Sequence, residues 1–290
     1  MSTDPALDPA LDLDEVRALI RTALDEDLRY GPDVTTAATV PADATSKAAV
    51  VSRQAGVLAG LDVGLLVLDE VLGAGGYEIT DRVPDGTRLE PGARALGLIA
   101  PTRGLLTAER TMLNLVCHLS GIATATAAWV DAVAGTGCRI RDSRKTLPGL
   151  RALQKYAVRV GGGVNHRMGL GDAALIKDNH VVAAGSVVEA LRAVRALAPE
   201  LPCEVEVDSL DQLDAVLAEG VQLVLLDNFP LWQTQAAVQR RNAVAPDTEL
   251  ESSGGLTLAD ATDYARTGVD YLAVGALTHS VRVLDLGLDM

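Results

Sequence analysis

Cationic side chains gather in one segment of this chain. Residues 139–180 contain nine Arg or Lys and only three Asp, although the whole chain has a formal net charge of −14. The chain has four lysines, and three of them fall in this segment: Lys145, Lys155 and Lys177. Arginine suits two-pronged binding of carboxylate or phosphate, and lysine supplies a compact point charge. The segment therefore predicts a pocket for a small, highly anionic ligand.

The cations of this segment fall into two groups. Arg144, Lys145 and Lys177 follow short apolar runs typical of strands, so we expect them at strand ends in the pocket. The other group recurs at helical spacing, and we expect it on a solvated helix face: Arg151, Lys155 and Arg159.

Composition excludes several kinds of partner and location. The acidic balance leaves no broad basic face, which excludes a nucleic acid or a membrane surface as partner. No apolar run is expected to reach membrane-spanning length, since even 57–72 is interrupted by Asp62, Asp69 and Glu70. The acidic, Pro-interrupted N-terminus does not resemble a signal peptide. Three scattered cysteines without metal-ligand spacing indicate free thiols, and we expect a cytoplasmic protein.

The first part of the chain predicts a small α+β, sandwich-like domain over residues 1–112. Asp12 can cap a helix, with Glu15 in the capping-box position. Short alternating runs between 48 and 100 indicate strands, interrupted by a helical segment near 61–72. The final alternating run, 281–290, is expected to return to this domain as an edge strand.

Two helices should follow. Thr107 is a plausible N-cap for a helix ending at Leu119, and a second helix over 122–134 follows Ser120-Gly121. Arg110 would then lie in a first turn, where the helix dipole disfavours a cation. A surface ion pair or a functional role would explain it.

From Cys138 onward the sequence repeats a strand, a polar tip and a helix. Six such units predict parallel strands with right-handed crossovers. A full eight-stranded barrel needs ~250 residues, more than this part of the chain contains. We therefore expect an incomplete, about six-stranded α/β barrel over residues 113–280, with a seam that another surface covers. The expected strands are 138–142, 173–177, 203–207, 222–226, 248–252 and 270–274, and the expected helices are 148–160, 186–198, 209–219, 231–243 and 257–267.

Functional residues in such barrels lie at the C-terminal ends of the strands. Here cations follow the early strands, acids the middle strands and small residues the late ones. Glu206 and Asp227 could hold ribose hydroxyls or a magnesium ion that bridges a pyrophosphate. A Ser-Ser-Gly-Gly turn that opens a helix would bind phosphate through backbone N–H groups. The strand-end residues are Arg144, Lys145, Lys177, Asp178, Glu206, Asp208, Asp227, Ser252, Ser253, Gly254, Gly255 and Gly275.

The histidines divide less clearly. His166, followed by Arg167 in a Gly-flanked loop, could add donors for a second anion. His118 lies on an apolar helix and is expected to be a hydrogen-bonded core histidine. The roles of His180 and His279 stay open.

Seven motifs in order resemble quinolinate phosphoribosyltransferase, also called nicotinate-nucleotide pyrophosphorylase (carboxylating). The resemblance extends from about Asp25, where EDLRYGPDVTT is similar to the family's opening motif, to the C-terminus. The motifs are RDSRKT (141–146), GGGVNHR (161–167), ALIKDNH (174–180), EVEVDS (204–209), LLDN (225–228), ESSGG (251–255) and VGALTHS (274–280).

This resemblance implies transfer of phosphoribose from 5-phosphoribosyl-1-pyrophosphate (PRPP) to quinolinate. Loss of CO2 then gives nicotinate mononucleotide, a precursor of NAD. It also implies a homodimer, or a higher oligomer, whose barrel sites are completed by the neighbouring subunit, with Arg110 donated across the interface. By motif, Arg144, His166, Arg167 and Lys177 would hold the quinolinate carboxylates. The donor with magnesium would be bound by Lys145, Glu206 and Asp227, and its 5′-phosphate by Ser253, Gly254, Gly255 and Gly275.

Three alternatives remain at this point. A paralogous phosphoribosyltransferase could act on another base. A lyase could use Lys177 as a Schiff-base nucleophile, which requires a desolvated, neutral amine. A non-catalytic nucleotide-binding regulator would not need both an acid pair and a cation cluster.

Overall fold

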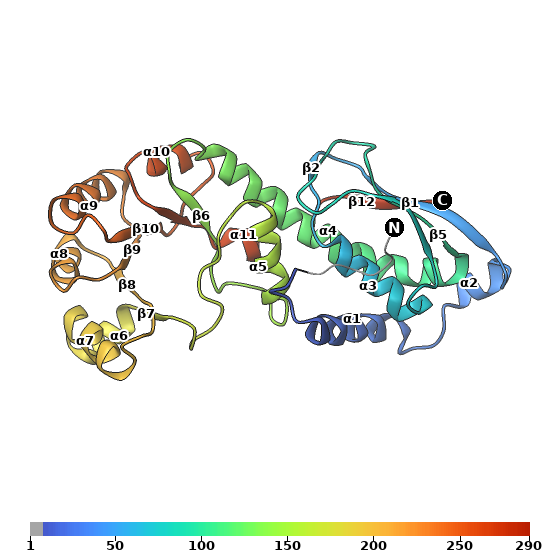
Figure 1. The fold of residues 1–290 in the computed structure, drawn as a ribbon, viewed down its shortest axis with the longest axis horizontal. Coiled ribbons are helices and arrows are strands. Elements are labelled where there is room, and N and C mark those ends of the chain that lie inside the picture. The colour runs from blue at the N-terminus through green and yellow to red at the C-terminus, as the bar shows by residue number, and fades with distance from the viewer. Residues whose placement is uncertain (1–7) are drawn as a thin grey trace. The chain divides into compact units, whose positions relative to one another are not determined.

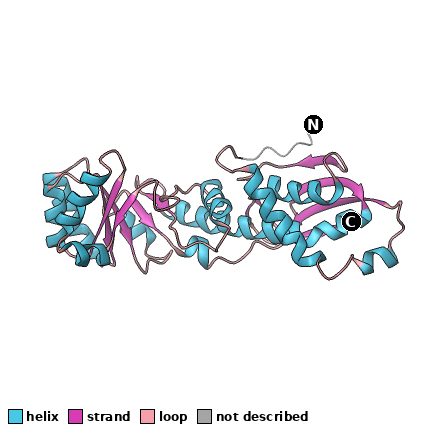
Figure 2. Cartoon of the chain, turned by 90° about the horizontal axis from the view of Figure 1, so that it is seen from below, coloured by secondary structure: helices cyan, strands magenta, loops and turns pink. Residues whose placement is uncertain are grey.

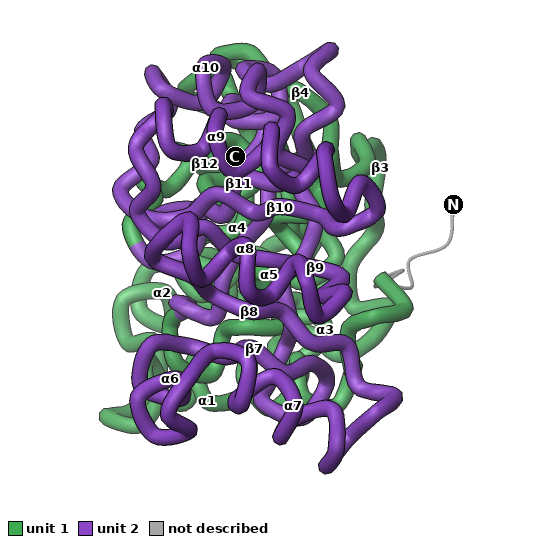
Figure 3. Tube along the Cα trace, turned by 90° about the vertical axis from the view of Figure 1, so that its left-hand side faces the viewer, with its two compact units in different colours: residues 1–125, 147–161, 280–290 green, residues 126–146, 162–279 purple. Residues whose placement is uncertain are grey.

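The computed structural model describes residues 8–290 and divides the chain into two compact units. The first unit contains residues up to 125, 147–161 and 280–290, and the second contains 126–146 and 162–279 (Figure 3). The sequence had placed the boundary at residue 112, whereas here residues 113–125 and 147–161 pack with the first unit.

A four-stranded antiparallel sheet forms the centre of the first unit, in the order β12-β1-β5-β3 (Figure 1). Val50 of β1 pairs with Leu96 of β5 on one side and with Leu288 of β12 on the other. The predicted return of the last residues to this unit is therefore confirmed. The strands are β1 (Thr45–Ser52), β3 (Glu78–Arg82), β5 (Arg94–Pro101) and β12 (Leu286–Asp289), beside a small pair, β2 (Gly56–Val57) and β4 (Arg88–Leu89).

Helices cover this sheet. Helix α1 begins as predicted, because the Asp12 side chain accepts hydrogen bonds from the backbone N–H groups of Asp14 and Glu15. The predicted helix near 61–72 is α3, and its buried leucines and valines supply much of the core. The helices that belong wholly to this unit are α1 (Leu13–Leu28), α2 (Val34–Thr39), α3 (Leu61–Leu72) and α5 (Arg151–Val160).

The two helices expected over 107–134 are one helix, α4 (Thr102–Ala132). Thr107 is not an N-cap, since its hydroxyl donates to the Arg103 carbonyl one turn earlier. Ser120 does not break the helix, because its hydroxyl is buried and hydrogen-bonded to the backbone of Ala59. Arg110 lies in the third turn, so the expected conflict with the helix dipole is wrong.

Helix α4 is also long and apolar enough to cross a membrane, by length and composition alone. The expectation that no apolar run reaches membrane-spanning length is therefore wrong for this helix. More than half of the apolar window, 56%, is buried inside the protein, as expected of a core helix in a folded domain.

The second unit contains six parallel strands in the order β6-β11-β10-β9-β8-β7. Strands β6 and β7 are the two edges of this order, so the predicted incomplete six-stranded barrel is confirmed. The strands are β6 (Arg139–Arg141), β7 (Ala174–Ile176), β8 (Cys203–Val207), β9 (Leu223–Asp227), β10 (Glu249–Ser253) and β11 (Tyr271–Ala273).

Helices lie along the outer side of these strands (Figure 2). Three of them, α7, α8 and α9, pack side by side (Figure 1). Helices α6 and α11 follow strand ends and were not predicted. The helices of this unit are α6 (Asp178–Ala184), α7 (Val187–Leu197), α8 (Leu210–Ala218), α9 (Leu231–Val244), α10 (Ala261–Ala265) and α11 (Ala276–His279).

Two expectations about single side chains have opposite outcomes. Lys155 was expected on a solvated helix face, but its side chain is fully buried. Leu153, Gln154, Ala157 and Val158 of the same helix are also buried, so polar and apolar side chains share its buried side. His118 is confirmed as a hydrogen-bonded core histidine, because its Nε2 lies 2.8 Å from Gln154 Nε2, and burial lowers its pKa.

The interior of α4 contains a glycine, Gly121, because another backbone segment packs closely against it. An ideal Cβ at this position would lie 2.3 Å from the Arg282 carbonyl oxygen, which is backbone and cannot move aside easily. We expect Gly121→Ala to lower the free energy of unfolding by about 1–3 kcal/mol through overpacking, despite alanine's better helix propensity. Chemical denaturation measures this. The control is Gly171→Ala, where a Cβ meets nothing within 4 Å, and an equal loss there would contradict the packing explanation.

Candidate active site

A cavity of about 170 Å³ opens at the C-terminal ends of the strands of the second unit. Because the strands are parallel and in register, with Ser253 opposite Asp227, their functional ends meet at one edge. Its lining includes nine of the predicted site residues, from segments far apart in sequence: Arg144, Lys145, His166, Arg167, Lys177, Glu206, Asp227, Ser253 and Gly275.

The floor of the cavity differs from its walls. The floor consists of three apolar residues, Leu175, Leu225 and Ala273, and one acidic residue, Glu251. Leu225 and Glu251 are register partners on β9 and β10. A ring-shaped ligand would therefore lie on an apolar base below a polar rim.

Crowded cations form one wall. Burial lowers the pKa of Arg167, and the like charge of Arg144 lowers it further. One guanidinium N–H of Arg167 donates to the Ala173 carbonyl at 2.9 Å. Like charges held together in this way are relieved by an anion, so this wall suits carboxylates.

Arg167 is held in place by its neighbours. Asp142, which is fully buried, accepts from the backbone N–H of His166 at 2.7 Å and from the Asn165 side chain at 2.6 Å. The His166 Nδ1 accepts from the backbone N–H of Arg167 at 2.8 Å. Nε2 of His166 lies 2.9 Å from Glu204 Oε2. Because Nδ1 is an acceptor, Nε2 carries the hydrogen. Both ring nitrogens therefore make bonds within the chain, and the predicted contact of His166 with a substrate carboxylate stays a prediction.

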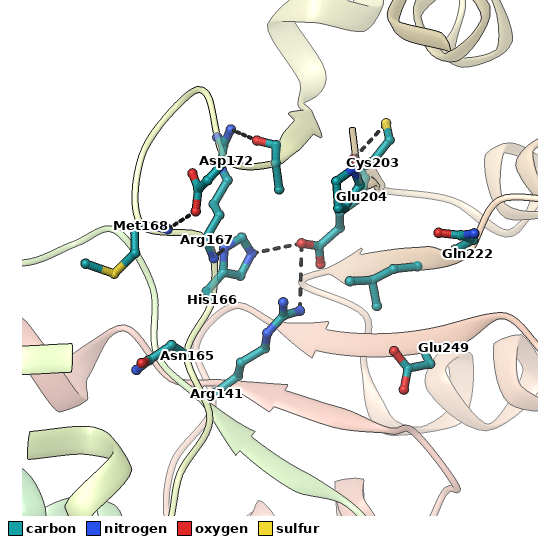
Figure 4. Close-up of a pocket in the computed structure, with 13 residues that line it drawn as sticks. Arg141, Asn165, His166, Arg167, Met168, Asp172, Cys203, Glu204, Gln222 and Glu249 are labelled. Atoms are coloured by element: carbon teal, nitrogen blue, oxygen red, sulfur yellow. Dashed lines mark hydrogen bonds and ion pairs between the residues drawn. The ribbon is translucent and has the colours of Figure 1, made fainter. Parts of the chain in front are cut away.

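A second cavity, of about 400 Å³, lies at the opposite end of the strands (Figure 4). Figure 4 shows His166 and Arg141 both directed at Glu204. Arg141 also lies 2.6 Å from Glu251 Oε2. His166 and Arg167 line both cavities, so these two polar side chains form the layer between them.

The buried trio of His166, Glu204 and Glu251 brings three potential metal-ligand atoms within 4.8 Å of one another. It does not suit a cation. His166 presents an N–H rather than a lone pair to Glu204, and Arg141 already supplies the positive charge next to Glu251. The trio is better described as a buried hydrogen-bonded charge network.

Acidic side chains form the opposite wall. Glu206 and Asp227 border a further cavity of about 210 Å³ together with Asp178 and Asp208. Carboxylate oxygens at the rim are the hard ligands that magnesium prefers, so this donor set fits the ion. Lys177 Nζ lies 2.5 Å from Glu206 Oε2, so the predicted carboxylate-binding lysine and the predicted donor-binding acid are paired with each other.

The small-residue turn follows β10. Gly254 has a φ of +99°, and an ideal Cβ there would lie 2.1 Å from Asn228 Oδ1. Only glycine therefore fits beside Asn228, which itself has a positive φ of 55°. The turn was expected to open a helix, but the next helix begins only at Ala261, so the helix-dipole argument for phosphate binding is wrong. The part of the phosphate-binding argument that still applies is the set of backbone N–H groups in the turn.

The structure adds residues that the sequence analysis did not select. Asp142 and Glu251 also line the cavity. They lie in the RDSRKT and ESSGG motifs, but the sequence pattern marks them only as strand residues. His180, left undecided, accepts from the Lys177 backbone N–H at 2.9 Å and so fixes the start of α6. Gly275 leaves room for the stem of Lys145, since a Cβ would lie 3.1 Å from Lys145 Cδ. Arg110 is exposed on α4 in the other unit, and its role stays a prediction.

Comparison with known proteins gives a consistent result. Residues 33–120 match the family model "Quinolinate phosphoribosyl transferase, N-terminal domain", and residues 122–289 match the model of its C-terminal domain. The chain is 71% identical to a nicotinate-nucleotide pyrophosphorylase (carboxylating) of Mycobacterium leprae, over 96% of this chain and 98% of that one. It is 37% identical to the human protein of that name, over 94% of this chain and 91% of that one.

A solved structure shows the same architecture. The crystal structure of NadC from Streptococcus pyogenes superposes with a TM-score of 0.91, at 38% identity and 98% coverage of both chains. The two family models together span most of the chain, and the similarity to the relatives covers nearly their whole length. The chain belongs to the quinolinate phosphoribosyltransferase family.

Proposed function

We propose that this chain transfers phosphoribose from PRPP to the ring nitrogen of quinolinate, with loss of CO2. The products are nicotinate mononucleotide, CO2 and pyrophosphate. The observation that carries the proposal is that one cavity joins four cations to the carboxylates of Glu206 and Asp227 at the strand ends. Membership of the family, and relatives named for this reaction, support it.

The two walls of the cavity suit the two substrates. Quinolinate is a dianion, and the cations Arg144, Arg167 and Lys177 would bind its carboxylates, the retained one more firmly than the departing one. Glu206 and Asp227 would bind the donor with magnesium, and Lys145 would lie near its pyrophosphate. The Ser253–Gly255 turn and Gly275 would receive the 5′-phosphate.

Charge stabilisation accounts for most of the first step. As pyrophosphate leaves, positive charge builds on the ribose and negative charge on the leaving group. Lys145 is exposed and can reach the leaving group, while its backbone is held by the Thr278 hydroxyl at 2.9 Å. Bound magnesium would neutralise further negative charge there. After attack by the ring nitrogen, the pyridinium stabilises the carbanion that remains when the adjacent carboxylate departs.

The ion pair between Lys177 and Glu206 gives the empty site a resting state. Each group neutralises the other, so neither charge stands alone before the substrates arrive. Donor and metal at Glu206 would release Lys177 toward a carboxylate. The two substrates would then promote each other's binding.

Assembly and location are further parts of the proposal. The unclosed order of strands, with β6 and β7 at its edges, supports a homodimer or a higher oligomer in which a neighbouring subunit supplies Arg110. The free cysteines support a cytoplasmic location.

The lyase alternative does not suit the site. It needs a desolvated, unpaired amine, but the Lys177 side chain is 46% exposed and paired with the Glu206 carboxylate. One assay distinguishes the proposed function from that of a paralogue that acts on another base. Labelled CO2 should be released from quinolinate only when PRPP is present, and release without PRPP, or none at all, would contradict the proposal.

Lys177→Ala should cost about 2–4 kcal/mol of transition-state stabilisation, because a substrate carboxylate loses its point charge and Glu206 loses its partner. Steady-state kcat/KM measures the loss. The matched control is Lys47→Ala, an exposed lysine of the first unit, which should retain wild-type kcat/KM. Near-wild-type turnover of Lys177→Ala, with its melting temperature unchanged, would remove Lys177 from the site.

Asp227→Asn should weaken binding of magnesium and PRPP far more than binding of quinolinate, because Asp227 lies on the acidic wall. Calorimetric titration of each ligand separates the two effects. Asp211→Asn, on the exposed face of α8, is the control and should change neither. Equal weakening of both ligands by Asp227→Asn would contradict the division into two walls.

Arg110 can be tested for action in the neighbouring subunit. Arg110→Ala and Lys177→Ala homodimers should each be nearly inactive. When their subunits exchange, roughly half of the dimers become hybrids, each with one intact site, so activity should return to about a quarter of wild type. Mass tagging confirms exchange. If exchange occurs and activity stays near zero, Arg110 serves its own subunit.

A further inference from the structure

Glu251 has an unusual position in the cavity floor. Its side chain is fully buried, projects from β10 among Leu175, Leu225 and Ala273, and lines the same cavity as Lys177. Oε2 pairs with Arg141, whereas Oε1 has no hydrogen-bond partner among the described atoms. A buried oxygen left without a partner is costly unless something else approaches it.

The charges around Glu251 do not balance. Arg141 from β6 faces it, but Glu204 from β8 adds a second carboxylate, and Asp142 adds a third charge nearby. His166 cannot compensate, because its Nε2–H is directed at Glu204 and lies 3.9 Å from Glu251 Oε1. Burial, and then the charge of Glu204, raise the pKa of Glu251 to about 8, although Arg141 opposes the shift. Burial and the neighbouring carboxylates therefore favour the protonated form of this carboxyl group.

We propose that Glu251 donates the proton that replaces CO2 on the pyridine ring, an inference that rests on the proposed function. The bond between C2 and the departing carboxylate breaks, CO2 leaves, and the electron pair stays on C2 next to the pyridinium nitrogen. The proton of the Glu251 carboxyl moves to C2. Glu251 is left as a carboxylate paired with Arg141 and regains a proton from water.

The surroundings suit this role at each stage. A neutral acid in the floor does not repel a dianionic substrate, as a carboxylate would. The apolar neighbours give the departing carboxylate few hydrogen bonds, which favours its loss as CO2. When Glu251 ionises, Arg141 is already 2.6 Å away to stabilise the new charge. Arg144 and Arg167 cannot act as the donor, since a guanidinium does not release its proton in proteins.

Glu251→Gln tests the proposal, because it keeps the shape of the side chain and removes the acid. Product formation should fall about 100-fold or more, while quinolinate binding changes little. In a single turnover, pyrophosphate should appear at close to the wild-type rate and nicotinate mononucleotide should lag behind it. Simultaneous appearance of both products at the wild-type rate would overturn the proposal. Glu251→Asp, which keeps an acid, should recover part of the lost rate, and no recovery in a folded variant would contradict the role.

The pH profile separates an acid from a merely structural residue. A group that must be protonated is active below its pKa, so wild-type kcat should fall above about pH 8, and this fall should be absent from Glu251→Gln. In Glu204→Gln the fall should move to lower pH, because a like charge beside Glu251 is removed. An unchanged fall in Glu251→Gln would overturn the inference. If wild-type protein releases no pyrophosphate from PRPP and quinolinate, the proposed function itself fails.

Discussion

A buried excess of negative charge constrains the interior of the barrel unit. Asp142, Glu204 and Glu251 are all buried, and Arg141 with His166 supplies their partners. Removing Arg141 would leave buried carboxyl groups without their positive partner, which is far more costly than losing a surface pair. The same bonds fix the backbone before Arg167, so the cationic wall is placed by acids beneath it.

The empty site is arranged so that opposite charges compensate each other. Lys177 and Glu206 project from the ends of β7 and β8 and meet, while like-charged Arg144 and Arg167 remain crowded together. A substrate with only one anionic group would relieve the crowding without replacing the partner of Glu206. If both substrates bind as proposed, charge balance would contribute to selectivity for the two ligands together, in addition to shape.

Much of this organisation could be predicted from sequence, because parallel strands place their polar ends at one edge. Strand β8 was predicted residue for residue, and nine predicted site residues line one cavity. Local rules failed where distant contacts decide the outcome. Ser120-Gly121 looks like a break until Ala59 and Arg282 pack against it, and nothing near Lys155 in sequence indicates its burial. Glu251 could not be separated from an ordinary strand residue, since its role depends on three other segments.

The return of β12 to β1 has a consequence for the order of events on the ribosome. The central sheet of the first unit includes Leu286–Asp289, and the same unit takes up 147–161. One edge of strand β1 therefore stays unpaired until Leu286–Asp289 have been synthesised and can pair with it. The usual folding of the N-terminal domain first cannot be completed here. Until that pairing forms, the free edge of β1 is open to edge-to-edge association with other nascent chains.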